Sequence, residues 1–326
     1  MAKRSLHENF WAITCYFNPV GYRRRLENYR VFRQRLVVPL VTVELSFDGN
    51  FELSEEDADV LVKIRGGDVM WQKERLLNVA LKWVPENCDK VGWLDCDVVF
   101  DSNDWVQRAS RALDQFPLVH LFHERYDLSP SVGIDSIDLC DTGTVASSVV
   151  YKFTTEEASP EDYLLSVPRQ KRLVTTGVAW ASPKEVLQKH GLYDACILGG
   201  GDRAILCAAL GKFDYCTRPF LMSARRAEHY LAWAHPYFKM IRGRVGYVPG
   251  RLFHLWHGEV ADRQYEERRR YLAKFDFDPF SDIALDENGC WRWNSDKTEL
   301  HKCVKDYFES RNEDGEMSRK VFYTGG

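Results

Sequence analysis

Apolar runs of strand length alternate with segments of helical periodicity from Phe10 to Lys274. The runs are rich in β-branched and aromatic residues and end at turn-forming residues, as buried strands do. The predicted strands cover residues 10–17, 37–47, 58–64, 91–100, 118–122, 173–182 and 243–253. The predicted helices cover residues 21–36, 71–83, 104–115, 183–191, 203–210, 263–274 and 297–310. This alternation is typical of an α/β fold with a doubly wound, mainly parallel central sheet.

The regular pattern is interrupted in two places. Between Asp127 and Arg172 it gives way to Ser, Thr, Asp and Gly with short apolar pieces, and so long an irregular segment usually carries function or disorder. After Lys274 the only strong pattern is one helix. We therefore predict one domain over residues 1–274 and a small C-terminal extension over residues 275–326, whose last fifteen or so residues are loosely held.

The composition is that of a globular protein without a strong overall charge. The chain of 326 residues is 45% hydrophobic and 28% charged, and its net charge is −4, so only a local basic patch could bind a polyanion. Its nine cysteines include no C-x-x-C pair, which argues for a reducing compartment and against a disulfide framework. No apolar segment has the length of a signal or an anchor. These features predict a soluble cytoplasmic protein with no membrane contact, in the host cytoplasm if the source is viral.

The run from Val91 to Phe100 carries two acids, Asp95 and Asp97, inside an otherwise apolar segment. A buried carboxylate is costly unless it is paired, hydrogen-bonded or bound to a metal. A divalent cation would resolve the conflict, because ligands bind at the carboxyl ends of the strands of an open α/β sheet. Acids that emerge into solvent at a strand end would resolve it too. The D-x-D pattern alone leaves both interpretations open.

Two further motifs carry candidate chemistry. Asp202 follows three glycines, residues 199–201, at the start of a predicted helix. Successive glycines are costly in backbone entropy and indicate close approach of another group, although an N-cap would by itself explain the acid. Downstream, His254 and His257 lie three residues apart in an irregular turn. Each could be a metal ligand or a hydrogen-bonded core imidazole.

In this order, the Asp95-Cys96-Asp97 strand end, the acid after the glycine run and the distant histidine resemble the GT-A glycosyltransferases. These are Rossmann-like enzymes that mostly use a nucleotide-sugar. The resemblance extends from about Phe10 to Lys274 and implies a single GT-A domain. It also implies a divalent cation, Mn²⁺ or Mg²⁺, that offsets the charge of the departing diphosphate, and a UDP-sugar as the donor.

The resemblance also implies a role for each motif residue. Asp97 would bind the metal, and Asp95 would contact the ribose or a metal-bound water. One of the two histidines would complete the metal site, with His257 preferred over His254. Asp202 would be the general base that takes the proton of the acceptor hydroxyl in an inverting reaction.

Candidate donor-binding residues lie at the ends of the first strands and around the next helix. The rule that ligands bind at the carboxyl ends of the strands selects Thr14, Phe17 and Glu44 for base and ribose contacts. The resemblance adds a set that brackets residues 71–83 and includes basic, amide and aromatic side chains. These are Arg65, Trp71, Lys73, Arg75 and Asn78. Packing or surface roles are the alternative for Trp71 and Arg75.

The acceptor is predicted from a segment in which arginines alternate with aromatic residues. The candidate residues are Arg225, Arg226, Trp233, Arg242 and Arg244. Such a mixture suits a polyanion with stacked or flipped bases, and it suits a sugar-stacking cleft or a solvated face nearly as well. Three segments, 14–19, 71–78 and 93–97, resemble phage and kinetoplastid enzymes that glycosylate hydroxymethylated pyrimidines in DNA. A glycan precursor or a protein side chain is the alternative acceptor.

Two other classes of function remain open at this stage. Leu94 to Val99 also resembles the D-x-D-x-[TV] motif of haloacid-dehalogenase-type phosphatases, in which Asp95 would be the phosphorylated nucleophile. That motif normally ends the first strand of its fold, whereas three predicted strands precede it here. A binding module that keeps the fold without turnover is the third possibility.

Overall fold

A computed structural model describes residues 9–132, 143–156, 159–166 and 173–315. The predictions made for the first eight residues, for the last eleven and for parts of the segment 127–172 lie outside the described residues. The largest element is a seven-stranded sheet in the order β11-β6-β10-β4-β1-β2-β3. Its strands are β1 (Phe10–Phe17), β2 (Leu40–Ser46), β3 (Val60–Arg65), β4 (Lys90–Leu94), β6 (Leu118–His120), β10 (Ala179–Pro183) and β11 (Val245–Tyr247). All neighbours pair in parallel except at β10, which is antiparallel to both β4 and β6. The predicted α/β class with a mainly parallel central sheet is confirmed.

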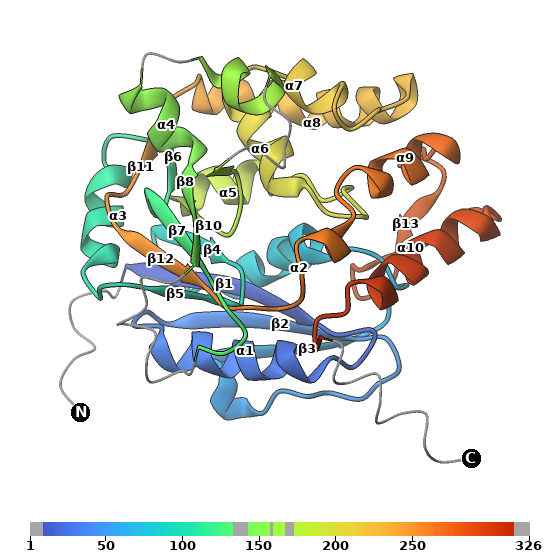
Figure 1. The fold of residues 1–326 in the computed structure, drawn as a ribbon, viewed down its shortest axis with the longest axis horizontal. Helices are drawn as coiled ribbons and strands as arrows, with labels where there is room; N and C mark the ends of the chain where they lie inside the picture. The colour runs from blue at the N-terminus through green and yellow to red at the C-terminus, as the bar shows by residue number, and fades with distance from the viewer. Residues whose placement is uncertain (1–8, 133–142, 157–158, 167–172, 316–326) are drawn as a thin grey trace.

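Helices cover both faces of this sheet (Figure 1). The helices of the first 210 residues are α1 (Arg23–Arg35), α2 (Lys73–Ala80), α3 (Trp105–Leu113), α4 (Val149–Thr155), α5 (Lys184–His190) and α6 (Gly201–Ala209). Helices α1 and α3 contribute Phe32 and Ala109 to the core on one face, where they join Ala12 and Leu40 of the sheet. Helices α2, α5 and α6 pack on the other face. Because both faces are covered, all seven residues of β2 are buried, and its polar side chains Thr42, Glu44 and Ser46 are buried with the apolar ones.

A second, smaller sheet crosses the end of the first and has the order β5-β12-β7-β8-β9. Its strands are β5 (Val98–Phe100), β7 (Glu124–Leu128), β8 (Gly143–Ser148), β9 (Val174–Thr175) and β12 (Arg251–His254). The predicted strands 91–100, 173–182 and 243–253 are wrong as single elements, since each is divided between the two sheets. The backbone bends at Asp95–Asp97, at Val178 and at Gly250 respectively, and the last two of these have positive φ. The D-x-D acids therefore occupy a corner between β4 and β5, which explains how they lie within an apolar run.

The longest helix, α8 (Ala224–Ile241), is absent from the sequence-based prediction. It follows the short helix α7 (Asp214–Thr217) and packs on α6. Its buried side chains include Tyr230, Ala234, Tyr237 and Ile241, which recur at helical spacing. Part of the segment interpreted as an arginine and aromatic patch is therefore a core face. None of the helices formed by the described residues is long and apolar enough to cross a bilayer.

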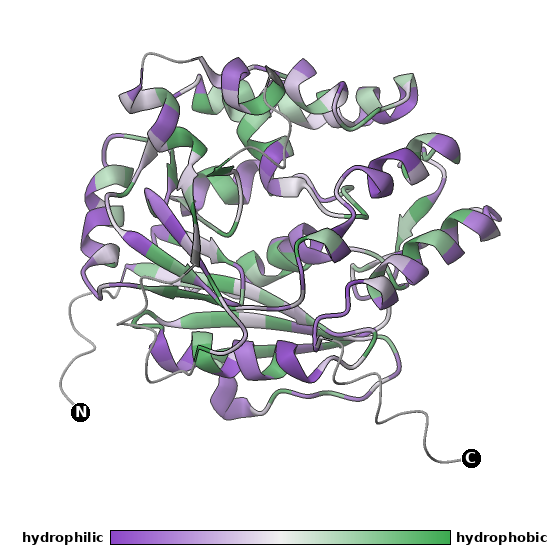
Figure 2. Ribbon diagram, in the orientation of Figure 1, coloured by the Kyte–Doolittle hydropathy of each residue, from purple (hydrophilic) through white to green (hydrophobic). Residues whose placement is uncertain are grey.

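The chain beyond Lys274 packs against the central domain. It follows α9 (Glu267–Lys274) and consists of a hairpin, β13 (Ile283–Leu285) and β14 (Trp291–Trp293), and of α10 (Thr298–Ser310), which lies beside α9 (Figure 1). Hydrophilic positions gather on α9, whereas the strands of the central sheet are mainly hydrophobic (Figure 2). The segment after α10 returns to α1 at the start of the chain.

Two acids join this C-terminal segment to α1. Glu313 is buried between Arg25, at 2.5 Å, and Arg311. Burial alone would raise the pKa of Glu313, but the two guanidinium groups lower it to about 2. Asp314 accepts hydrogen bonds from the backbone N–H groups of Arg23 (3.1 Å) and Arg24 (2.8 Å), and so caps a helix that has no cap from its own first turn.

Asp314→Ala is expected to lower the free energy of unfolding by about 1 kcal/mol, the usual cost of removing a helix cap. The measurement is urea denaturation followed by circular dichroism. Glu309→Ala is the control, because the Glu309 side chain is exposed on α10 and such surface changes usually stay within about 0.5 kcal/mol. Equal stability of the two variants would show that the cap contributes nothing measurable.

Candidate active site

A cavity of about 1000 Å³ opens where the ends of β1 and β4 meet the second sheet. Its walls come from the last residues of β1, the D-x-D corner, the start of α6 and the loop after β12. The segment after α10 also contributes, through Arg311 and Glu313. The cavity therefore lies at the carboxyl end of the parallel strands, where the rule for open α/β sheets places a ligand.

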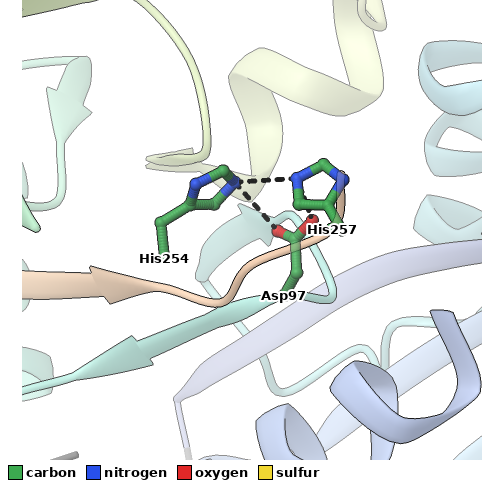
Figure 3. A group of neighbouring side chains, drawn as sticks. All are labelled: Asp97, His254 and His257. Atoms are coloured by element: carbon green, nitrogen blue, oxygen red, sulfur yellow. Dashed lines mark hydrogen bonds and ion pairs between the residues drawn. The ribbon is translucent and has the colours of Figure 1, made fainter. Parts of the chain in front are cut away.

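Asp97, His254 and His257 form a compact group at this cavity (Figure 3). His257 Nε2 lies 3.1 Å from Asp97 Oδ2, and the two imidazole Nε2 atoms lie 3.2 Å apart. The second sheet builds this arrangement. Asp97 immediately precedes β5, whose first residue pairs with His254 at the end of β12. The sequence left open which histidine belongs to the site, and the structure brings both to the same carboxylate.

The atoms of this group fit a divalent cation. Asp97 Oδ1 is buried and accepts no hydrogen bond from the described residues, so it keeps a lone pair for another partner. Ligand atoms about 2.1 Å from one octahedral ion lie about 3 Å apart when they are adjacent, close to the N–N and N–O separations observed here. Because two donors are imidazoles, the set favours Mn²⁺ over Mg²⁺, which prefers oxygen ligands.

The surroundings of the two rings differ. Burial, together with the neighbouring guanidinium of Arg263, lowers the pKa of His257 well below its ordinary value. Arg263 NH2 lies 2.7 Å from Nε2 of this ring, the nitrogen that also faces Asp97. His254 Nδ1 lies 2.8 Å from a carboxylate oxygen of Asp127, so its Nε2 faces Asp97 and His257. An imidazole must be neutral to bind a metal, and the lowered pKa of His257 meets this condition.

Asp95 is not part of the metal group. Its Oδ1 lies 2.5 Å from Lys73 Nζ, and the same ammonium group lies 2.9 Å from Asp202 Oδ2. Burial alone would lower the pKa of Lys73, but the two carboxylates raise it well above its ordinary value. Lys73 is therefore a buried cation that joins the first acid of the D-x-D corner to the acid after the glycine run.

Asp202 is the second residue of α6 and does not serve as its N-cap, which is Gly200. Burial raises the pKa of Asp202, and the Lys73 ammonium partly offsets that effect. Its Oδ2 is bonded to Lys73, whereas its Oδ1 accepts no hydrogen bond from the described residues. One oxygen is thus held in place by Lys73, and the other is buried with its lone pairs unused.

The glycine run is explained by two close approaches. Gly200 has a φ of +102°, and a Cβ there would lie 2.7 Å from the ring of Phe220. A Cβ on Gly201 would lie 2.2 Å from the carboxylate of Glu74, which is buried and whose pKa is raised by burial to about 8. The close approach expected from the sequence is present, but the approaching groups belong to the protein itself. The run brings the start of α6, and with it Asp202, against α2.

Five of the predicted donor residues line the cavity: Asp95, Thr14, Phe17, Trp71 and Lys73. Thr14 donates a hydrogen bond to the carbonyl of Leu94 at 2.7 Å and so ties β1 to the residue before the D-x-D corner. The rings of Phe17 and Trp71 meet edge to face with centroids 5.8 Å apart. These aromatic side chains form one wall at the end of β1.

The other four predicted donor residues do not line the cavity. Glu44 is buried and accepts hydrogen bonds from the backbone N–H groups of Glu52 and Leu53, which fixes the loop after β2. Arg75 and Asn78 both bond Asp194, and Asn78 also bonds Leu192. Arg65 packs its side chain against Gly49. The polar groups of these residues stabilise neighbouring loops. The positions of such residues in the sequence do not show whether they bind a loop or a ligand.

The predicted acceptor residues are likewise not among those that line the cavity. Arg226 is buried and bonds the carbonyl of Phe220, and Trp233 bonds the carbonyl of His190. Three exposed arginines have protein partners. They are Arg225, which pairs with Glu228 and Asp278, Arg242, which bonds Lys239, and Arg244, which bonds Gln115. The structure does not bring these five residues together into one surface.

Sequence reasoning missed Asp127, Arg263, Arg25 and Arg311, all of which line the cavity. Asp127 lies on β7, in a stretch assigned to the irregular segment, although alternation from 124 to 128 was a weak strand signal. Arg311 and Arg25 meet only because the C-terminal segment returns to α1. No local pattern predicts a contact between residues almost 290 positions apart.

The chain matches no protein-family model and no curated protein. Among solved structures, glucosyl-3-phosphoglycerate synthase from Mycobacterium tuberculosis, solved with Mn²⁺, UDP and phosphoglyceric acid, is 14% identical with a TM-score of 0.39, over 85% of this chain and 82% of that one. S. aureus TarS 1–349, in complex with UDP-GlcNAc, is 13% identical with a TM-score of 0.38, over 96% and 76%. The mannosyltransferase PcManGT from Pyrobaculum calidifontis, with GDP-Man and Mn²⁺, is 11% identical with a TM-score of 0.39, over 83% and 63%. These identities and TM-scores are too low to assign an activity to this chain, so its function is inferred from the site.

Proposed function

We propose that this protein is a metal-dependent glycosyltransferase that moves a sugar from a nucleoside diphosphate donor to a hydroxyl group. One observation carries the proposal: a cavity at the carboxyl end of the sheet contains both the Asp97–His254–His257 group and the Lys73–Asp202 pair. The first provides donor atoms for a cation, and the second provides a fixed carboxylate with a free oxygen. A sugar transfer that inverts the anomeric centre needs both functions in one site.

Asp97, His254 and His257 would hold the cation, which when bound offsets the charge that develops on the diphosphate leaving group. Asp95 precedes Asp97 by two residues and is held by Lys73. By the family resemblance, Asp95 would contact the ribose. Phe17 and Trp71 offer an apolar wall for the nucleobase. The choice of uridine as that base comes from the family resemblance.

Asp202 would act as the general base. Its Oδ2 is fixed by Lys73 and its Oδ1 accepts no hydrogen bond from the described residues, so Oδ1 can take the proton of an acceptor hydroxyl once the groups that bury it move aside. The ammonium group favours the ionised carboxylate, which burial alone would disfavour. Because Lys73 also bonds Asp95, the same ammonium group holds Asp95 and Asp202 in fixed positions relative to each other.

The identity of the acceptor is a separate question. The finer prediction, a 5-hydroxymethylpyrimidine in DNA, rests on the sequence resemblance, and the dispersed positions of Arg225, Arg226, Trp233, Arg242 and Arg244 give it no support. A small glycan precursor or a protein side chain is the alternative acceptor. All three belong to the proposed reaction class, because each offers a hydroxyl group.

The phosphatase alternative is not favoured. Three strands, β1, β2 and β3, precede the D-x-D corner, whereas the phosphatase motif follows the first strand of its fold. Asp95, the residue that would be phosphorylated, is held by Lys73 and is not one of the residues grouped for a cation.

The proposed function predicts that Mn²⁺ is required for hydrolysis or transfer of a nucleotide-sugar. Purified protein would be incubated with UDP-, GDP-, CDP- and ADP-sugars, with Mn²⁺, Mg²⁺, Zn²⁺ or EDTA, and release of the nucleoside diphosphate measured. We expect release from a UDP-sugar with Mn²⁺ and its loss with EDTA. Acceptor panels would include DNA containing 5-hydroxymethylcytosine or 5-hydroxymethyluracil, simple glycosides and peptides. Release unchanged by EDTA, or no turnover of any donor, would contradict the proposal.

A further inference from the structure

His254 has a partner on the neighbouring strand that the proposed reaction does not use. Strand β12 runs parallel to β7, and the register places His254 opposite Asp127. Asp127 Oδ1 lies 2.8 Å from His254 Nδ1, on the side of the ring away from Asp97. The contact is therefore set by sheet pairing and does not depend on a flexible loop.

Asp127 is itself held by a guanidinium group. Arg125 NH2 donates to Asp127 Oδ2 at 2.8 Å, and Arg125 NH1 donates to Thr175 Oγ1 on β9 at 3.0 Å. A carboxylate paired with a guanidinium is ionised and can only accept hydrogen bonds. His254 must then carry a proton on Nδ1, and in the neutral ring the lone pair is on Nε2.

We infer that Asp127 is a positioning residue that fixes the tautomer and the ring orientation of His254, so that Nε2 is presented as a metal ligand. The inference rests on the metal site of the proposed function. His254 Nε2 points at Asp97 Oδ1, 3.7 Å away, and at His257 Nε2, 3.2 Å away. A histidine whose second nitrogen donates to a carboxylate is more basic toward the metal and loses less freedom on binding.

His257 provides a contrast within the same site. Its Nδ1 lies 3.1 Å from the guanidinium of Arg263, whereas Nδ1 of His254 lies 2.8 Å from the carboxylate of Asp127. Loss of Asp127 should therefore affect one ligand and leave the other. Because of this difference, the inference can be tested by measuring the tautomer of His254 alone.

The test uses Asp127→Asn in the full-length protein. A neutral amide can accept from Nδ1–H or donate to an unprotonated Nδ1, so it no longer selects one tautomer. In the metal-free wild type, ¹⁵N NMR of the imidazole groups should show the Nδ1–H tautomer for His254, assigned with His254→Gln. In Asp127→Asn that tautomer should be lost or mixed with the other. Binding of Mn²⁺, followed by the EPR signal of the free ion, should weaken about 10- to 100-fold.

Asp101→Asn is the matched control. Asp101 is also paired with an arginine on this sheet, Arg251 at 3.0 Å, but it follows β5 at the end away from the cation group. Its Mn²⁺ affinity and its His254 spectrum should equal those of the wild type. An unchanged tautomer and unchanged Mn²⁺ affinity in Asp127→Asn would overturn the inference. If the wild type bound no Mn²⁺, the proposed metal site would fail, while the NMR comparison would still decide the role of Asp127.

Discussion

Asp97→Asn is expected to reduce Mn²⁺ affinity by more than about 100-fold and to remove transferase activity at ordinary Mn²⁺ concentrations. Replacing a carboxylate that only hydrogen-bonds to a metal ligand lowers metal affinity about 10- to 100-fold. Replacing the charged ligand itself should therefore lower the affinity further. Asp97 is the only acid in the group and contacts both of its histidines. EPR titration with Mn²⁺ and release of the nucleoside diphosphate would measure the two effects.

The fold should survive this change. Burial raises the pKa of Asp97, so its ionised form is disfavoured when no cation is near, and a neutral amide of the same shape should be tolerated. The melting temperature of metal-free Asp97→Asn is therefore expected to be at or above that of the wild type. Full turnover by Asp97→Asn would remove the cation from the proposed mechanism.

Asp202→Asn is expected to lower the rate of transfer by about 10²- to 10⁴-fold, the usual contribution of a general base, with little change in donor affinity. The amide keeps the size of the side chain and can still accept a hydrogen bond from Lys73, but it cannot take a proton. Because burial raises the pKa of Asp202 despite Lys73, wild-type activity should fall on the acid side at a higher pH than for an ordinary aspartate. The pH dependence of transfer, and donor binding by calorimetry, would separate these effects.

Asp194→Asn is a suitable control for Asp202→Asn. Asp194 is a buried carboxylate whose pKa is also raised by burial and which faces a cation, Arg75, at 2.9 Å, but it does not line the cavity. Asp194→Asn should lower the free energy of unfolding but leave the rate of transfer per folded molecule unchanged. Similar losses of transfer in both variants would mean that Asp202 acts through stability and not through proton transfer.

The sequence predicts the central sheet well because its strands and helices each carry their own periodicity. Strands β1 to β3 and helices α1 to α3 fall within a few residues of their predicted ranges. The second sheet was not predicted, because three of its strands continue directly from strands of the first sheet. Nothing in an apolar run indicates that the chain changes sheets at Asp95–Asp97 or at Gly250.

Helix α8 was missed for a different reason. Its arginines and aromatic residues were interpreted as an acceptor surface, although Tyr230, Ala234, Tyr237 and Ile241 recur at helical spacing. A count of apolar positions would have found the helix. The assignment of its arginines to an acceptor surface followed from treating charge before periodicity.

Of the candidate site, Asp97, His254, His257 and Asp202 could be named from motifs, because each lies next to a recognisable strand end or glycine run. Asp127 and the Arg25–Glu313–Arg311 cluster could not be named in this way. Their roles depend on sheet register and on the return of the C-terminal segment to α1. These contacts are determined by tertiary structure, so a short segment of sequence does not predict them.

The return of the C-terminal segment has a consequence for biosynthesis. Arg25 leaves the ribosome long before its partner Glu313, which follows it by 288 residues, and before the cap Asp314. The central sheet can assemble on the nascent chain, whereas the cavity wall that contains Arg311 cannot close until synthesis has passed that point. A chain released before residue 311 would leave Arg25 buried without its counter-ion. Incomplete products should therefore be catalytically silent and short-lived, so that donor is not hydrolysed by protein fragments.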